Sequence, residues 1–349
     1  MNGRERVQAV LAGQPVDRPP LLPILHSGLA TLAGVPLGDY LTNAATMAEV
    51  TTSGWQRLGL DGVQMSLGVT AEAQALGALV LQPRDGGPQL LDVLLPDLAA
   101  LDSLRQRDAT IGGRMPLFFE AVQRVVQEIG EEVYVLATLR GPLLLASQLY
   151  GVQELLIDLI ERPQAVAALL DYTTELALSL GRWLLASGAH GLVLGEATCS
   201  PSFIAPALYR RLVQPRHRQL VAGLKKSGWG AVGLHICGNI LPILEDIIAS
   251  GVDFCDIDYQ VPTLNALGLA RGRLALRGNL DPSGDLFLGQ PAELAAKIEQ
   301  LLREVAGQRW ITSSGCDIPP GTPEANLFMM AQTVRNAKAG SLALPKGED

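Results

Sequence analysis

Short apolar runs alternate with longer segments of helical periodicity in the second half of the chain, and this alternation restricts the possible folds more than any other feature. The runs HGLVLGE, GAVGLHIC, DFCDID, LALRGN and RWITSSG occupy residues 190–196, 230–237, 253–258, 274–279 and 309–315. A helix-like segment follows each run, and the last one covers residues 322–340 with Gly340 near its end. Strands that alternate with helices are typical of a parallel sheet covered by helices. The pattern therefore predicts an α/β fold.

The first half supplies three further strand-like runs, at residues 21–26, 61–67 and 131–139. Two helices are expected after residue 139, separated at Arg162-Pro163, and the short apolar pieces between residues 68 and 112 are expected to form a hairpin. About eight strands, each tracked by a helix, predict a TIM (β/α)8 barrel with an N-terminal extension and a hairpin insertion after the second strand. Because no linker interrupts the chain, residues 1–349 are interpreted as one domain.

Charge and hydropathy exclude two classes of partner. The formal net charge is −8 and no block rich in Lys or Arg offsets it, which argues against nucleic acid. The apolar stretch 143–163 is interrupted by Gln153, Glu154 and Asp158, so it is interpreted as an amphipathic helix and not as a membrane span. The charged start of the sequence does not resemble a signal peptide. A cytoplasmic protein without a membrane partner is expected.

One of only 4 histidines and one of only 4 cysteines stand two positions apart at the end of a predicted strand. Side chains two apart on a strand point to the same side, so His235 and Cys237 can reach one ion, and Cys316 after the last strand can supply a third ligand. One imidazole and two thiolates suit Zn²⁺, and three protein ligands leave one position open, as in catalytic sites. The alternative is that these residues, like Cys199 and Cys255, only fill the core.

The segments HICGN, GNLDP and GCDIPPGTPEANL, in this order, resemble the uroporphyrinogen decarboxylase superfamily. They are most similar to its zinc-dependent methyltransferase branch, which includes the methylcobamide:coenzyme M methyltransferases, and the resemblance runs from RERVQAVLAGQPVDRPP to MAQTVRNAKAG. It implies a TIM barrel in which His235, Cys237 and Cys316 bind zinc. It also implies an acidic fourth ligand, which is Asp258 or, as a fallback, Asp256.

Four other residues at predicted strand ends are candidates for binding the cofactor or substrate. His26 ends the first strand and could line the pocket, and Glu196 ends the strand 190–196 at the same mouth. Asn279 and Asp281 in GNLDP could face the pocket as well. For each there is a structural alternative, because a loop histidine, a helix-capping carboxylate or a turn-forming Asn is common at such positions.

The resemblance implies transfer of a methyl group from a methylcobamide, held by a separate corrinoid protein, to a small thiol of the coenzyme M kind. The decarboxylase branch holds its polycarboxylate substrate with an arginine-rich segment near the amino terminus, but no arginine lies between Arg18 and Arg57 here. A metal-free decarboxylase and a non-catalytic barrel that binds a corrinoid or a thiol remain alternatives. The sequence leaves open the methyl acceptor, such as a folate or homocysteine, and whether the protein forms a homodimer.

Overall fold

A parallel sheet forms the centre of the computed structural model, which describes residues 1–337. Its strands pair in chain order and every pair is parallel. They are β1 (Gly62–Met65), β4 (Tyr134–Arg140), β5 (Gly191–Gly195), β6 (Val232–His235), β7 (Phe254–Asp256), β8 (Ala275–Leu280) and β9 (Trp310–Ser314). The predicted α/β fold with a parallel sheet is therefore confirmed.

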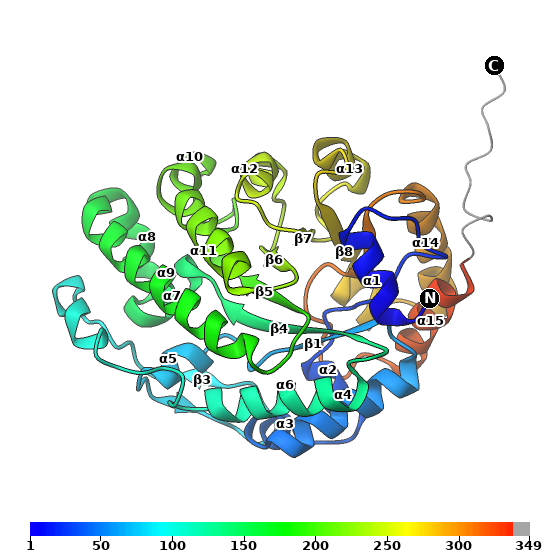
Figure 1. Ribbon diagram of the computed structural model, residues 1–349, viewed down its shortest axis with the longest axis horizontal. Coiled ribbons are helices and arrows are strands. Elements are labelled where there is room, and N and C mark those ends of the chain that lie inside the picture. The colour runs from blue at the N-terminus through cyan, green and yellow to red at the C-terminus, as the bar shows by residue number, and fades with distance from the viewer. Residues whose placement is uncertain (338–349) are drawn as a thin grey trace.

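Helices surround the curved sheet, with α4 and α6 along one side and α9 and α11 along another (Figure 1). The helices are α1 (Gly3–Leu11), α2 (Ser27–Leu32), α3 (Leu37–Thr42), α4 (Ala44–Leu58), α5 (Ala71–Ala75), α6 (Met115–Ile129), α7 (Pro142–Tyr150), α8 (Val152–Glu161), α9 (Pro163–Leu185), α10 (Pro206–Leu208), α11 (Gln214–Ser227), α12 (Leu244–Ala249), α13 (Thr263–Ala270), α14 (Pro291–Glu304) and α15 (Glu324–Asn336). Gly340, expected near the end of the last helix, lies outside the described residues.

The first predicted strand, residues 21–26, is reduced to a single parallel bridge between Leu21 and Thr312. The segment still lies between β9 and β1: Leu22 N donates to Thr312 O at 3.0 Å, and Asp61 N donates to Leu21 O at 2.9 Å. Proline has no backbone N–H, so Pro20 and Pro23 cannot extend the ladder. The segment thus occupies the eighth position and joins the two edges of the seven-stranded sheet.

The core has two layers. Inside the barrel, side chains from seven positions around the sheet meet Val7 and Val10 of α1, which closes the amino-terminal end of the strands. These inward residues are Leu22, Tyr134, Leu136, Val193, Ala231, Phe254, Ala275 and Ile311. A larger cluster fills the space between the outer face of the sheet and the helices. The packed interior leaves the carboxyl ends of the strands as the place for a site.

The predicted helix over residues 143–163 is wrong in one respect, because the structure divides it into α7 and α8. Gly151 between them has φ 101°, a conformation that residues with a side chain rarely adopt, and the two helices are bent by 111°. No single helix among residues 1–337 is long and apolar enough to cross a membrane; only this bent pair passes such a test, by length and composition alone.

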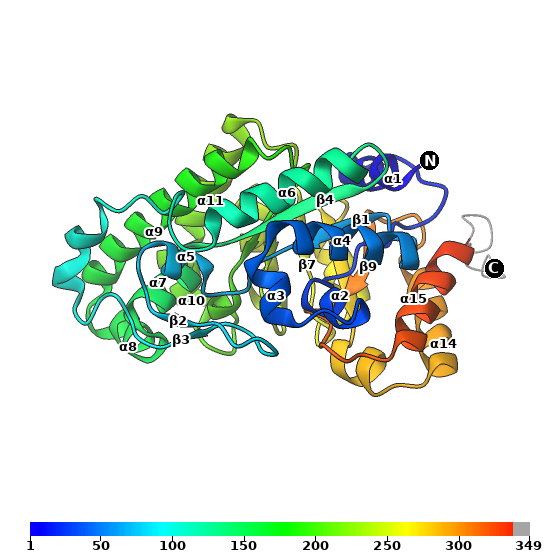
Figure 2. The same ribbon diagram turned by 90° about the horizontal axis from the view of Figure 1, so that it is seen from below.

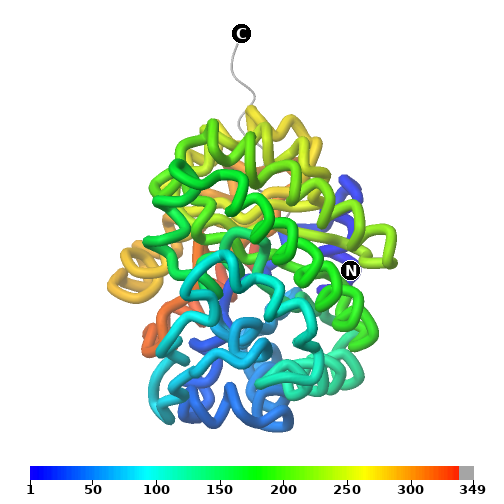
Figure 3. The backbone as a smooth tube through the Cα atoms, turned by 90° about the vertical axis from the view of Figure 1, so that its left-hand side faces the viewer, coloured from blue at the N-terminus to red at the C-terminus, as the bar shows by residue number. Residues whose placement is uncertain are grey.

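A short antiparallel pair, β2 (Val80–Leu81) and β3 (Gln89–Leu90), lies between β1 and β4 in the sequence. The segment that follows β3 runs beside α7, since Leu95 N donates to Leu149 O at 2.9 Å (Figure 2). In the view of Figure 3 most of the blue and cyan segments lie below the green and yellow ones. Arg57 of α4 pairs with Glu324 of α15, so an early helix contacts the last helix.

Asp61 holds the closing segment in place. Its carboxylate accepts the Leu21 N–H at 2.7 Å, accepts Arg18 Nη1 at 2.6 Å, and also pairs with the buried Arg6. Replacing Asp61 with alanine leaves a buried guanidinium and a buried N–H without this partner. We expect D61A to lower the free energy of unfolding by about 3 to 5 kcal/mol, measured by guanidinium denaturation.

Asp17 provides the matched control, because it pairs with the same Arg6 but its side chain is 49% exposed. We expect D17A to cost about 1 kcal/mol or less. Equal losses in the two variants would show that Asp61 does not close the barrel.

Candidate metal centre

His235, Cys237 and Cys316 come together at the carboxyl end of the sheet. His235 ends β6, Cys237 follows it in the same loop, and Cys316 follows β9. Cys237 Sγ lies 3.4 Å from His235 Nε2 and 3.8 Å from Cys316 Sγ, and Cys316 Sγ lies 3.8 Å from His235 Nε2. The structure therefore brings the three predicted ligands into one triangle of donor atoms.

These distances fit a tetrahedral zinc ion. Zn–S bonds of about 2.3 Å and Zn–N bonds of about 2.0 to 2.1 Å place two sulfurs about 3.8 Å apart, and sulfur and nitrogen about 3.6 Å apart, at tetrahedral angles. The three separations in the protein, 3.4 to 3.8 Å, match this triangle. Both the donor chemistry and the geometry thus suit Zn²⁺, with three protein ligands and one position for another group.

The imidazole of His235 is oriented by Asp256, the last residue of β7. His235 Nδ1 lies 2.9 Å from Asp256 Oδ2, so Nε2 points to the two sulfurs. Arg277 of β8, fully buried, donates to both Asp256 oxygens at 2.6 and 2.5 Å. Burial of Asp256 opposes its ionisation, but Arg277 and His235 outweigh this effect and lower the pKa of Asp256. Asp256 therefore acts on the site through His235, as carboxylates behind ligand histidines do.

The three donors influence one another's pKa values. Burial lowers the pKa of His235, but the hydrogen bonds with Asp256 and Cys316 outweigh this and raise it to about 9. The contact between the two cysteine sulfurs lowers the pKa of Cys316, with a further contribution from His235, and raises the pKa of Cys237. The cluster therefore favours a thiolate on one of the two sulfurs.

Asp258, the expected fourth ligand, is not brought into this triangle. Its Oδ2 accepts the Gly238 N–H at 2.9 Å and its Oδ1 accepts the Gln260 N–H at 3.0 Å. Gly238 follows Cys237 and has φ 81°, so the carboxylate fixes the tight turn of the HxC loop. Asp258 supports the loop that carries Cys237.

The donor triangle opens into a cavity of about 320 Å³ at the carboxyl end of the strands. His26 and Glu196 line it, as predicted for the barrel mouth. His26 Nδ1 accepts the Ser27 N–H at 3.1 Å and lies 3.3 Å from Asp317, and burial lowers the pKa of His26. His26 is thus a neutral polar group in the cavity wall.

Glu196 is fully buried and its carboxylate is occupied by protein groups. It accepts N–H groups of Leu143 and Leu144 in the first turn of α7 at 3.0 and 2.8 Å, and lies 2.8 Å from His217 Nε2. A carboxylate at a helix N-terminus is favourable for the helix dipole. Glu196 therefore anchors the start of α7 in the cavity wall, and the buried His217 completes this anchor.

Asn279, near the end of β8, and Asp281, directly after β8, lie outside this cavity. Asn279 Nδ2 donates to Val261 O at 3.0 Å and its Oδ1 accepts from Thr263 at 3.2 Å. Asp281 accepts the N–H groups of Ser283 and Gly284 at 2.9 and 3.0 Å. Neither side chain lines the cavity beside the donor triangle, and Asp281 caps the helical turn that follows β8. Their role in binding a cofactor or substrate stays a prediction.

Sequence analysis missed a group of polar residues that line the cavity together with the donor triangle. Gln64 of β1, Thr138 and Arg140 of β4, and Ser66 line the same cavity and are buried. They lie in ordinary strand sequences without a motif, and only the sheet register brings them to the mouth. The nearest sequence signal was a lone arginine, Arg140, at the end of an otherwise apolar strand.

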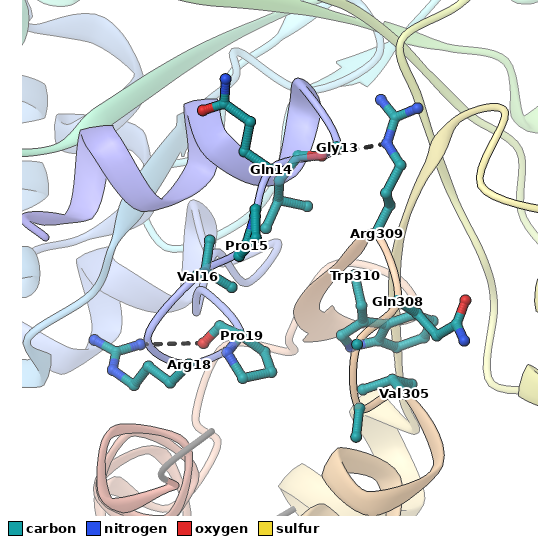
Figure 4. A pocket seen from close by; sticks show the side chains of 13 residues that line it. Gly13, Gln14, Pro15, Val16, Arg18, Pro19, Val305, Gln308, Arg309 and Trp310 are labelled. Carbon is teal, nitrogen blue, oxygen red and sulfur yellow. Dashed lines mark hydrogen bonds between the residues drawn. The ribbon is translucent and has the colours of Figure 1, made fainter. Parts of the chain in front are cut away.

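A second cavity of similar size, about 330 Å³, lies at the opposite end of the strands (Figure 4). Arg18, Arg309 and Trp310 line it together with the loop 13–16, and Arg309 Nε donates to Val10 O at 3.3 Å. No histidine, cysteine or carboxylate among residues 1–337 lines it. Donor chemistry therefore distinguishes the two cavities and assigns the metal centre to the carboxyl end.

The family model for uroporphyrinogen decarboxylase (URO-D) matches residues 2–337 of the chain. The chain is 26% identical over 341 residues to the methylcobamide:CoM methyltransferase MtbA of Methanosarcina acetivorans, which covers 96% of this chain and 98% of that protein. It is 25% identical over 329 residues to a uroporphyrinogen decarboxylase of a Synechococcus species, with 90% and 91% covered. A solved methyltransferase from Methanosarcina mazei shares the fold, with a TM-score of 0.88, 23% identity and coverage of 96% and 98%.

Removing either sulfur should remove the metal. We expect C237A and C316A each to reduce bound zinc from about one ion per chain to below about 0.2, because two remaining ligands bind too weakly to survive dialysis. Zinc is measured by mass spectrometry after dialysis. C255A removes a buried cysteine outside the triangle and should keep full zinc content; full zinc in C316A would rule out the proposed ligand set.

Zinc binding should depend on pH in a defined direction. His235, with a pKa of about 9, and Cys237, whose pKa is raised, must both lose protons before they can bind the ion. We expect zinc affinity to rise from about pH 6 to 9, with about two protons released per ion at pH 7. Calorimetry in buffers of different ionisation enthalpy measures this release, and pH-independent binding without proton release would contradict the assignment.

Proposed function

The chain belongs to the uroporphyrinogen decarboxylase family, and we propose that within it the protein is a zinc-dependent methyltransferase. The methyl donor is a methylated corrinoid carried by a separate protein, and the acceptor is a small thiol. The donor triangle of His235, Cys237 and Cys316 at an open cavity carries the proposal, because it fits a catalytic zinc site. Relatives named as methylcobamide:CoM and methylated-thiol:coenzyme M methyltransferases support it.

The reaction needs a thiolate, since a free thiol has a pKa near 8.5 and is mostly protonated at neutral pH. A zinc ion held by His235, Cys237 and Cys316 would supply positive charge that lowers the pKa of the substrate thiol while leaving its sulfur nucleophilic. The sulfur lone pair forms the new S–C bond as the C–Co bond breaks. The electron pair of that bond remains on cobalt, which passes from Co(III) to Co(I), and the thiol proton goes to solvent.

The chain's own residues provide the setting for this step. His235, Cys237 and Cys316 would hold the ion, and Asp256 with Arg277 keeps the imidazole turned toward it. Two thiolates and a neutral imidazole balance the charge of Zn²⁺, so a thiolate substrate arrives at a formally neutral centre. Such a sulfur-rich centre withdraws little electron density from the substrate sulfur.

The decarboxylase alternative has less support. Uroporphyrinogen carries many carboxylates, which in that branch are held by arginines, and Arg140 is the only arginine or lysine among the described residues that lines the cavity. A metal-free decarboxylase would also not require a cluster of one imidazole and two sulfurs. The metal donors and the scarcity of cationic groups both favour methyl transfer.

Turnover with free methylcobalamin tests the proposal. We expect the zinc-loaded protein to form a methyl thioether and cob(I)alamin from methylcobalamin and 2-mercaptoethanesulfonate, and we expect C316A to lose at least about 100-fold in rate, since the nucleophile is no longer activated. Cobalamin absorbance and mass spectrometry follow the two products. C255A serves as the matched control. Unchanged turnover after zinc removal, or decarboxylation of uroporphyrinogen without methyl transfer, would overturn it.

A further inference from the structure

Two of the four cysteines are placed to react with each other and with small molecules. Cys237 and Cys316 line the cavity at the carboxyl end of the strands and are partly exposed. Cys199 and Cys255 are fully buried, and Cys255 Sγ donates to the carbonyl oxygen of Asp256 at 3.4 Å. A reagent that enters the cavity therefore meets one pair of sulfurs and neither of the other two.

The two sulfurs of this pair are close enough to form a disulfide. They are 3.8 Å apart, and an S–S bond of about 2.05 Å requires that they approach by about 1.8 Å. Cys237 lies in the loop after β6 and Cys316 in the loop after β9, so strand pairing does not fix either backbone. Rotation about the two Cα–Cβ bonds, together with a small shift of either loop, supplies this approach.

A disulfide at this position would remove two of the three metal donors in one step. Zinc binds thiolates and not the sulfurs of a disulfide, so the imidazole of His235 would be the one remaining ligand of the triangle. A single imidazole does not retain the ion. Because the triangle contains only two sulfurs, oxidation of the pair leaves no partly liganded zinc site.

The contacts that position the metal ligands do not involve the sulfurs. Asp256 holds the imidazole of His235 through Nδ1 at 2.9 Å. Asp258 holds the turn after Cys237 by accepting the Gly238 N–H at 2.9 Å. Both contacts persist when the sulfurs are oxidised, so the site can regain its metal-binding geometry when the disulfide is reduced.

We propose that Cys237 and Cys316 form a redox switch, in which the disulfide of a small thiol oxidises the pair to an internal disulfide and thereby expels the zinc ion. This inference rests on the proposed function, because it requires a zinc site in a cavity that admits small thiols. The disulfide of such a thiol carries the same end groups and enters through the same opening. Methyl transfer stops when the acceptor thiol is oxidised and resumes when it is reduced.

The exchange balances without any further oxidant. One cysteine thiolate attacks a sulfur of the small disulfide, forms a mixed disulfide and releases a first small thiolate. The other cysteine thiolate attacks the protein sulfur of the mixed disulfide and releases a second small thiolate. The two cysteines lose two electrons, the small disulfide gains them, and zinc leaves as Zn²⁺. The released thiolates take their protons from solvent.

Treatment of the zinc-loaded protein with the disulfide of 2-mercaptoethanesulfonate, without any methyl donor, tests the switch. We expect release of about one zinc ion per chain, measured with a chromogenic chelator, and loss of two of the four thiols. The intact mass should equal that of the reduced protein minus two hydrogens, and peptide mapping should show a link between Cys237 and Cys316. Dithiothreitol followed by zinc should restore the thiols and the metal.

Variants separate the two steps of the exchange. C237A and C316A each keep one sulfur of the pair, so the reaction should stop at the mixed disulfide and add one small-thiol group to the remaining cysteine. The matched control is C255A, which removes a buried cysteine outside the cavity. It should lose two thiols and release zinc as the unsubstituted protein does. Unchanged far-UV circular dichroism in the oxidised protein would show that the fold is retained.

The outcomes separate this inference from the proposed function. Zinc that stays bound with all four thiols intact, a protein that carries two small-thiol groups without the internal link, or a link to Cys199 or Cys255 overturns the switch and leaves the methyltransferase standing. The internal link and reversible zinc release in a protein that never transfers a methyl group support the switch and overturn the proposed reaction.

Discussion

Curvature of the sheet brings three metal donors together, and the rest of the site depends on this closure. His235 ends β6 and Cys237 lies just after it, while Cys316 follows β9, three strands away in the sheet order. In a flat sheet, strands so placed would be about 14 Å apart. Here their donor atoms are 3.4 to 3.8 Å apart. Closure depends on the short segment around Leu21, which a carboxylate and three backbone hydrogen bonds hold between β9 and β1.

The strands between the donors complete the centre. β7 contributes Asp256, which fixes the imidazole of His235, and β8 contributes Arg277, which keeps Asp256 ionised in a buried position. An ion pair so deeply buried contributes little net stability, but it defines which nitrogen of His235 faces the sulfurs. On the other side of β6, Gly195 leaves space and Arg140 supplies positive charge. The pairing register of the strands thus positions both the metal ligands and the residues on the other side of β6.

Much of this could be predicted from the sequence, because strand periodicity and the HxC motif are local signals. The parallel sheet, the approach of Cys316 to His235 and Cys237, and the position of Glu196 at the mouth all followed from strand ends converging in a barrel. The role of Asp258 could not be predicted, because a carboxylate after a strand can either bind a metal or accept a hydrogen bond from a loop N–H. The sequence does not distinguish these two roles. Arg140 was missed because its partner in register, Gly195, is 55 positions away and carries no side chain to signal a site. The break between α7 and α8 could not be predicted, because it depends on a positive φ at Gly151 that composition alone does not reveal.

X-ray absorption at the zinc edge, before and after adding 2-mercaptoethanesulfonate, identifies the metal ligands themselves. We expect two sulfur ligands and one imidazole nitrogen at about 2.3 and 2.0 to 2.1 Å in the resting protein, and a third sulfur at about 2.3 Å once the thiol binds. A zinc ion coordinated only by nitrogen and oxygen, or a sulfur count that does not rise with the thiol, would contradict it.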